Sequence, residues 1–108
     1  MERVNLVELR RFRPEKMQKV PVFETDKMFF DQYCLLPGHS QRVHHHAGED
    51  KVYLVLEGEA TFAIGGEEAV LGPGNAVIAR AGVPHGVRNV STDPVIVLAV
   101  MAPRPRPK

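Results

Sequence analysis

"RVHHHAGEDKVYLVLEGEA", residues 42–60, places three consecutive histidines before a turn and an apolar run. In an extended chain, residues i and i+2 point to the same side, so we expect His44 and His46 to share a face and His45 to point away. Two imidazoles on one face can bind a single divalent ion at about 2.0–2.2 Å. The pair alone also fits an exposed histidine cluster, so a metal site needs a further ligand.

A third histidine follows a turn later in the chain. His85 stands after Gly-Val-Pro in "AGVPHGVRN", residues 81–89, where a new strand is expected to begin. A third imidazole from a different strand would complete a metal site with His44 and His46. His39, in the turn "PGHS", is expected to be exposed.

Turn signals at short intervals predict an all-β protein. Short segments rich in Val, Ile, Leu, Phe and Tyr are separated by "PG" at 37–38, "EG" at 57–58, "GG" at 65–66 and "GPGN" at 72–75. This spacing is typical of a β-sandwich or β-barrel. The segment "TFAIGGEEAVL" predicts two strands joined by a two-residue Gly-Gly hairpin. Helix is limited to a short turn in "NLVELRRF", with Asn5 as its cap.

The composition is that of one ordinary globular domain. The 108 residues suit a single domain, whose core we place at about 20–102, followed by a Pro/Arg-rich tail at 103–108. The net charge of +1 gives no reason to expect a nucleic-acid or acidic-membrane partner. Cys34 is the one cysteine and cannot form an internal disulfide, and no apolar run resembles a signal peptide or a membrane span. We therefore predict a cytoplasmic protein.

Two expected strands are apolar on both faces. They are "VYLVL", residues 52–56, and "VIVLAVM", residues 95–101. A strand buried on both faces needs cover on both sides. The barrel interior supplies one side, and another sheet, a terminal segment or a second subunit must supply the other. We predict a homodimer with a closed two-fold interface.

The spacing of the two histidine segments resembles the two motifs of the cupin family. The first motif is Gly, five residues, His-x-His, three or four residues, Glu, six residues and Gly, and it falls here on Gly38, His44, His46, Lys51 and Gly58. The second is Gly, five residues, Pro-x-Gly, two residues, His, three residues and Asn, and it falls on Gly74, Arg80, Gly82, His85 and Asn89. Eight of the ten positions match, while lysine replaces the glutamate and arginine replaces the proline.

The resemblance implies a cupin double-stranded β-helix, or jelly-roll barrel, with an interior site. It implies that His44, His46 and His85 bind a divalent transition metal, which in such a family is Zn, Fe, Ni, Mn or Cu. It also implies a structural role for Asn89, for example in bonding a turn. The fourth ligand stays open because Lys51 stands at the glutamate position.

The sequence allows several placements of the Lys51 side chain. In the first it turns toward the barrel mouth, and in the second it pairs with a bound anionic ligand. A β-bulge in "AGED" would instead exchange the faces and make Asp50 the ligand. A neutral, nucleophilic lysine is a further alternative, although no partner for that chemistry is visible. Tyr53 has the same parity as Lys51 and is expected either to line the pocket or to belong to the core.

Three functions remain open, because one fold supports many chemistries. The first is a metalloenzyme with a three-histidine site, of dioxygenase or isomerase type, that acts on a small anionic molecule. The second is a non-catalytic barrel in which Lys51 and the histidines hold an anionic ligand, with or without metal. The third is a scaffold that acts through its surface. The sequence does not separate catalysis from binding.

Overall fold

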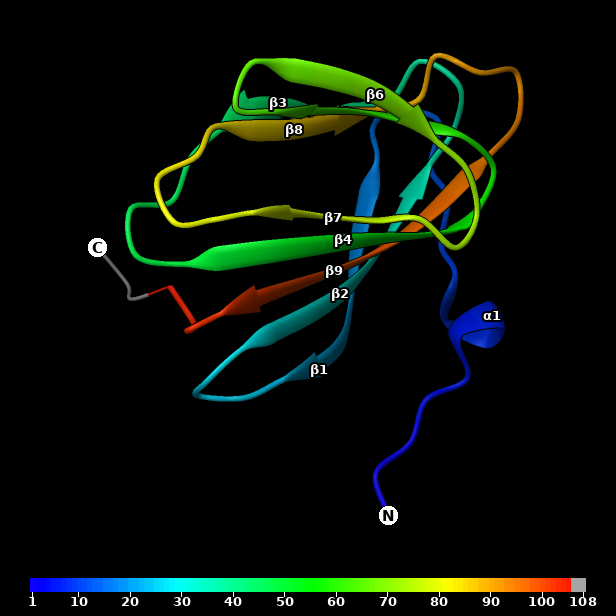
Figure 1. Ribbon diagram of the computed structural model, residues 1–108. Coiled ribbons are helices and arrows are strands. Elements are labelled where there is room, and N and C mark those ends of the chain that lie inside the picture. Colours follow the sequence, from blue (N-terminus) through cyan, green and yellow to red (C-terminus); the bar gives the residue numbers. More distant parts are fainter. Residues whose placement is uncertain (106–108) are drawn as a thin grey trace.

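The computed structural model describes residues 1–105, which form one short helix and nine strands (Figure 1). The elements are α1 (Leu6–Leu9), β1 (Gln18–Glu24), β2 (Phe29–Leu35), β3 (Ser40–His44), β4 (Asp50–Glu57), β5 (Ala60–Ile64), β6 (Glu67–Leu71), β7 (Ala76–Ala79), β8 (His85–Arg88) and β9 (Val95–Ala102). A five-stranded sheet has the order β1-β2-β9-β4-β7, and a four-stranded sheet has the order β3-β8-β5-β6. All the pairings are antiparallel.

Strands that are distant in sequence lie side by side. The last strand, β9, runs between β2 and β4, while β8 runs between β3 and β5. The two sheets face each other, and their inner side chains form the main core (Figure 1). This core is aromatic and β-branched in character, and its largest members are Tyr33, Leu35, Tyr53, Val55, Phe62, Val87 and Val97. The predicted all-β jelly roll is confirmed.

The hairpin between β5 and β6 has the predicted two-residue loop. Ile64 and Glu67 pair directly, which leaves Gly65 and Gly66 as the turn. Their φ angles are +58° and +88°. Glycine adopts positive φ without the steric cost that a Cβ imposes, and two such residues match the twist of a tight hairpin.

The N-terminal segment covers part of the outer face of the five-stranded sheet. Ile96 of β9 packs there against Val20 and Cys34, and Leu9 of α1 lies over them. The helix begins where the sequence predicted, because the Asn5 side chain accepts a hydrogen bond from the Glu8 N–H at 3.1 Å. In residues 1–105 no helix has the length and apolar character that crossing a membrane requires.

The expectation that residues 52–56 are buried on both faces is wrong. Lys51, Tyr53 and Val55 point inward and are buried, whereas Val52 is 37% exposed on the outer face. The strand therefore alternates as an ordinary half-buried strand does, but its outward side chains are apolar instead of polar. This apolar outer face remains partly exposed in a single copy of the chain.

The first residues of the predicted Pro/Arg-rich tail fold back onto the β1–β2 hairpin. The Arg104 N–H donates to the Lys27 carbonyl at 2.9 Å, and its guanidinium donates to the Thr25 carbonyl at 3.3 Å. The same guanidinium lies 4.9 Å from the ring centroid of Phe29. These contacts hold residues 103–105 beside the sheet. The rest of the predicted tail, residues 106–108, lies outside the described part of the chain.

Asn89 fixes the connection between β8 and β9. Its buried amide donates to the carbonyls of Leu35 and Asp93, at 3.1 and 2.8 Å. Its side-chain oxygen accepts from both the N–H and the hydroxyl of Ser91, at 2.9 and 2.6 Å. The structural role expected for Asn89 is confirmed. Gly58 lies close by, and a Cβ there would come within 2.6 Å of the Pro94 carbonyl oxygen.

Candidate metal and ligand site

Three histidines come together at one end of the barrel interior. His44 ends β3, His46 follows it, and His85 begins β8, directly opposite His44 in the strand pairing. One nitrogen from each of the three rings lies within 4.8 Å of the others. The closest rings are those of His44 and His85, with centroids 4.4 Å apart.

Two of these rings are oriented by the backbone. His44 Nδ1 lies 2.8 Å from the Arg42 carbonyl, and His85 Nδ1 lies 2.9 Å from the Val83 carbonyl. A carbonyl only accepts, so each Nδ1 donates and each Nε2 keeps a free lone pair, as in metal-binding histidines.

The hydrogen bonding of the His85 ring indicates whether a metal fits the site. Its Nε2 is buried and has no hydrogen-bond partner within the described residues. A buried polar atom without a partner costs about 1–3 kcal/mol. A metal ion would satisfy this nitrogen, so the residues present fit a metal.

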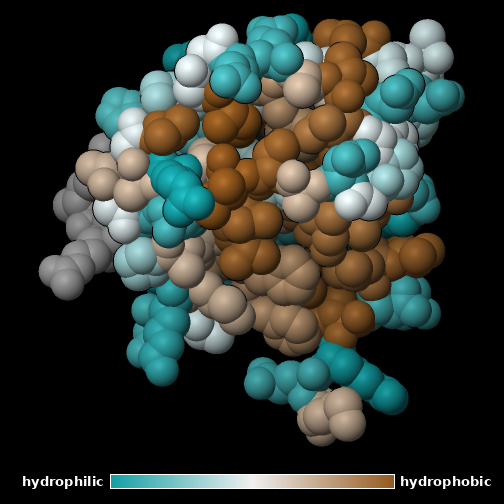
Figure 2. All heavy atoms as spheres, in the orientation of Figure 1, coloured by the Kyte–Doolittle hydropathy of each residue, from teal (hydrophilic) through white to brown (hydrophobic). Residues whose placement is uncertain are grey.

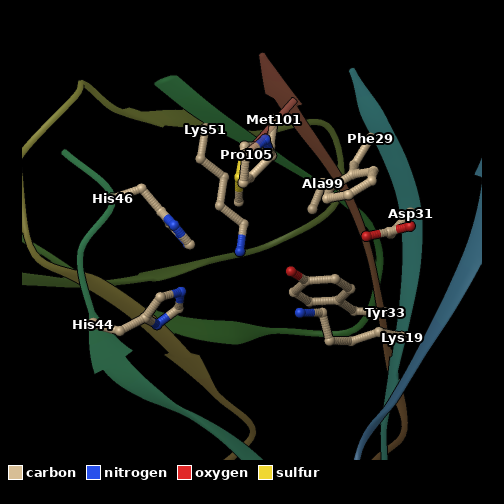
Figure 3. Close-up of a pocket in the computed structure, with 10 residues that line it drawn as sticks. All are labelled: Lys19, Phe29, Asp31, Tyr33, His44, His46, Lys51, Ala99, Met101 and Pro105. Atoms are coloured by element: carbon tan, nitrogen blue, oxygen red, sulfur yellow. The ribbon is translucent and has the colours of Figure 1, made fainter. Parts of the chain in front are cut away.

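His44 and His46 open onto a cavity of about 350 Å³. Figure 3 shows His44 and His46 on one side of it and the strands of the five-stranded sheet on the other. Lys51 reaches into the space between them, and the Tyr33 hydroxyl points toward the same space (Figure 3). The lining residues are Lys19, Phe29, Asp31, Tyr33, His44, His46, Lys51, Ala99, Met101 and Pro105.

Lys51 lies inward, as the six-residue spacing to Gly58 predicts. It is 2% exposed, and its Nζ lies 3.5 Å from Gln41 Oε1 and 4.9 Å from the ring centroid of Tyr53. Asp50 points the other way and accepts a hydrogen bond from the Ala81 N–H at 2.8 Å. The bulged register that would have turned Asp50 inward is therefore not adopted.

Gln41 links the polar side chains behind the cavity, and sequence reasoning missed it. Its Oε1 accepts a hydrogen bond from the Tyr53 hydroxyl at 2.9 Å, and its Nε2 donates to the Tyr33 hydroxyl oxygen at 3.3 Å. Tyr53 is fully buried and does not line the cavity, whereas Tyr33 does. An irregularity in the β3 register separates Gln41 from His44, so counting alternate residues back from His44 does not reach Gln41.

A family model of the cupin domain matches residues 32–101 of this chain. The chain belongs to the cupin family. The matched range contains all three histidines, Lys51 and Asn89. The solved structures and a curated relative agree with this assignment.

Two crystal structures illustrate the cupin fold of this chain. The TT1209 protein of Thermus thermophilus is 55% identical, covers 97% of this chain and 100% of its own, and superposes with a TM-score of 0.94. An uncharacterized conserved protein with a double-stranded beta-helix domain, from Klebsiella pneumoniae subsp. pneumoniae MGH 78578, is 28% identical. Its match covers 93% of this chain and 88% of that one, with a TM-score of 0.86.

A curated relative carries a functional name. The oxalate-binding protein of Thermotoga maritima is 31% identical over 72 residues, which make up 67% of this chain. The match spans 60% of the length of that relative.

This cupin differs from the family motif in the charge at its centre. Within residues 1–105, the cluster of close potential ligands contains three histidines and no carboxylate. Burial, together with repulsion from Lys19, lowers the Lys51 pKa to about 7, although Asp31 opposes both. The motif glutamate would supply a negative charge here, so the lysine replaces a metal ligand with a group that a cation repels.

The environment favours neutral imidazoles. Burial, with the charge of Lys51, lowers the pKa of His85 to about 4, although the hydrogen bond to the Val83 carbonyl opposes this. Burial likewise lowers the pKa values of His44 and His46. A histidine must be deprotonated to bind a metal, so all three are prepared for that role.

Proposed function

We propose that this cupin binds a divalent transition metal through His44, His46 and His85, and that the metal and Lys51 together hold a small anionic molecule in the cavity. The observation that carries the proposal is the group of three imidazole nitrogens within 4.8 Å, in which the buried His85 Nε2 has no other partner among the described residues. Imidazole nitrogens suit Zn, Fe, Ni and Cu, and Mn is a further candidate from the family.

Charge supports an anionic ligand. Three neutral histidines leave the full charge of a divalent ion uncompensated, and Lys51 adds a further positive group when it is protonated. Charges removed from water need a partner of the opposite sign. The name of the oxalate-binding relative agrees with a carboxylate in this position.

The Tyr33 hydroxyl is a second anchor for such an anion. Its oxygen accepts from Gln41, and the Gln41 oxygen is occupied by Tyr53 and Lys51. The Tyr33 O–H is then free to donate into the cavity that the residue lines. Tyr53, which the sequence singled out as a ligand-binding candidate, acts through Gln41 in this proposal.

Catalysis of dioxygenase or isomerase type is an extension of the same proposal. A metal held by His44, His46 and His85 would keep open positions and would supply Lewis-acid chemistry to a molecule bound there. The alternative is a barrel that binds the anion through Lys51 and protonated histidines without a metal. The lowered histidine pKa values disfavour this alternative near neutral pH.

Elemental analysis of protein purified without a histidine tag tests the proposal. We expect about one transition-metal ion per chain. The double variant His44→Ala/His46→Ala should lose it, while His45→Ala should keep it, since His45 is exposed and points away from the site. Titration of oxalate into metal-loaded and chelator-treated protein then tests whether anion binding needs the metal. Full metal content in the double variant would contradict the assignment.

We also propose that the chain forms a homodimer through the outer face of the five-stranded sheet. One row across this face is apolar on every strand and consists of Phe23, Phe30, Val100, Val52 and Ile78. Figure 2 shows hydrophobic residues gathered over the middle of this sheet. The row offers no charge for a polar partner, whereas the same row on a second copy complements it about a two-fold axis.

A further inference from the structure

One side of the ligand cavity is apolar, and the strand register builds it. Lys51, Met101 and Phe29 lie side by side on the inner face of β4, β9 and β2. Ala99 follows in the next row, between Tyr53 and Asp31. Met101, Phe29 and Ala99 all line the cavity. The row that supplies the buried lysine therefore also supplies apolar side chains beside it.

The C-terminal residues complete this apolar side. Arg104 is held to the β1–β2 hairpin by its hydrogen bonds to Lys27 and Thr25, and it lies over the Phe29 ring. This anchoring places Pro105 in the cavity lining. We define the apolar wall as Phe29, Ala99, Met101 and Pro105.

Lys51 points away from this wall, whereas Asp31 lies beside it. Lys51 Nζ lies over the Tyr33 and Tyr53 rings, at 5.2 and 4.9 Å from their centroids. Figure 3 shows the Lys51 nitrogen directed toward the Tyr33 hydroxyl and the histidines, while Met101, Pro105, Ala99 and Phe29 lie at the other end. The cavity thus has a polar end and an apolar end.

The cavity leaves room beyond a two-carbon acid, and the charge of Asp31 disfavours a second acid group at the apolar end. The cavity of about 350 Å³ has the volume of about twelve waters, whereas a two-carbon dianion such as oxalate has that of about three. The remaining space adjoins the apolar wall and Asp31, a half-buried carboxyl. Lys19 is the cation that acts most strongly on Asp31, and its Nζ lies by the Tyr33 ring, 5.6 Å from the centroid.

We propose that the ligand is a monocarboxylate with an oxygen on the neighbouring carbon, a 2-oxo or 2-hydroxy acid, that carries an aliphatic or aromatic substituent. This inference rests on the proposed metal and anion site. The carboxylate and its neighbouring oxygen occupy the polar end near the histidines, Lys51 and Tyr33. The substituent packs on the apolar wall, where its burial contributes affinity. A second carboxylate at that end would meet Asp31, so longer diacids bind less well.

Calorimetric titration of the zinc-loaded full chain with a matched series of acids tests the inference. The series is oxalate, pyruvate, 2-oxoglutarate, 4-methyl-2-oxopentanoate and phenylpyruvate. We expect the last two to bind about tenfold or more tightly than pyruvate and 2-oxoglutarate. Met101→Gln keeps the length of the side chain but makes it polar, and it should reduce this preference to about threefold or less.

Two further variants keep the test independent of folding defects. Pro105→Ser changes a partly exposed residue outside the strands, and it should weaken the same preference. Val70→Thr is the matched control, because Val70 is 59% exposed on the four-stranded sheet and does not line the cavity, so the change should leave the preference intact.

The outcomes separate this inference from the proposed function. If oxalate or 2-oxoglutarate binds as tightly as the apolar acids, the inference is overturned while the anion site stands. If none of the acids binds the zinc-loaded chain, the proposed function fails and the inference fails with it. A preference that survives both Met101→Gln and Pro105→Ser also overturns the inference.

Discussion

Lys51 Nζ lies 3.5 Å from Gln41 Oε1, the acceptor that the described residues place beside this buried ammonium. An ammonium carries three donors, so a single long contact leaves it under-solvated. Cation–π contacts with Tyr33 and Tyr53 supply part of the compensation. The position therefore tolerates a charge poorly, and this has consequences for metal affinity and for stability.

Glutamate at position 51 should strengthen metal binding. Lys51→Glu restores the carboxylate of the cupin motif on a side chain that already points inward, and we expect zinc affinity to rise about tenfold to a hundredfold. Competition with a chromophoric chelator measures the change. Asp50→Ala is the control and should leave affinity unchanged, since Asp50 bonds the Ala81 N–H. Loss of zinc in Asp50→Ala, without a gain in Lys51→Glu, would show that the register is wrong.

The metal-free protein should become more stable as the pH rises above neutrality. Burial lowers the folded-state pKa of Lys51 to about 7 from an ordinary value of 10.5. Between these values the unfolded chain binds a proton that the folded chain does not, so the free energy of unfolding increases with pH across this window. Below pH 7 Lys51 is protonated in both the folded and the unfolded chain, so the folded chain bears the full cost of burying the charge. Lys51→Met should then raise the free energy of unfolding by about 2–4 kcal/mol.

Urea unfolding with a chelator, at about pH 6 and about pH 9.5, measures this dependence. Lys16→Met is the control, because Lys16 is exposed and should not alter the pH dependence. Equal pH slopes in wild type and Lys51→Met would contradict the prediction.

Asn89→Ala should destabilise the barrel without altering the metal site directly. The substitution leaves the Leu35 and Asp93 carbonyls without their amide donor and removes the acceptor of Ser91. Unpaired buried groups cost about 1–3 kcal/mol each, so we expect a loss of about 2–4 kcal/mol in the free energy of unfolding. Chemical denaturation measures it. Asn75→Ala removes one exposed hydrogen bond to Gly72 and should cost under about 1 kcal/mol. Equal losses in the two variants would disprove the role of Asn89.

A charge on the apolar outer face should dissociate the proposed homodimer. Ile78→Asp places a carboxylate in the row with Val52 and Val100, where a dimer would bury it unpaired. We expect light scattering to give a dimer mass for wild type and a monomer mass for this variant. Val70→Asp is the control, since Val70 is 59% exposed on the other sheet. A monomer mass for the wild type at every concentration would rule out the homodimer.

The sequence predicted the placement of the histidines better than that of the other polar groups. Alternation in an extended chain paired His44 with His46, and the turn before His85 indicated a second strand. The position of Lys51 followed from its spacing to Gly58 in the family motif. The inward position of Gln41 was not predicted, because the β3 register is irregular between Gln41 and His44. Alternate residues therefore do not keep to the same face there.

The apolar pattern of β4 misled for a different reason. Alternation is visible in a sequence only where the outward side chains are polar, and Val52, Leu54 and Leu56 are not. Burial depends on what covers the outer face, which the pattern of one strand does not record. Ile96, on the outer face of β9, is buried, because a segment from the distant N-terminus covers it.

The docking of Arg104 has a practical consequence for handling this protein. Only three residues would separate Pro105, which lines the cavity, from a purification tag fused after Lys108. A polyhistidine tag there would bring extra imidazoles to the entrance of a three-histidine site and would compete for the metal being counted. The N-terminus lies away from the C-terminal end of β9 (Figure 1). A cleavable tag at the N-terminus leaves both the metal stoichiometry and the ligand titrations interpretable.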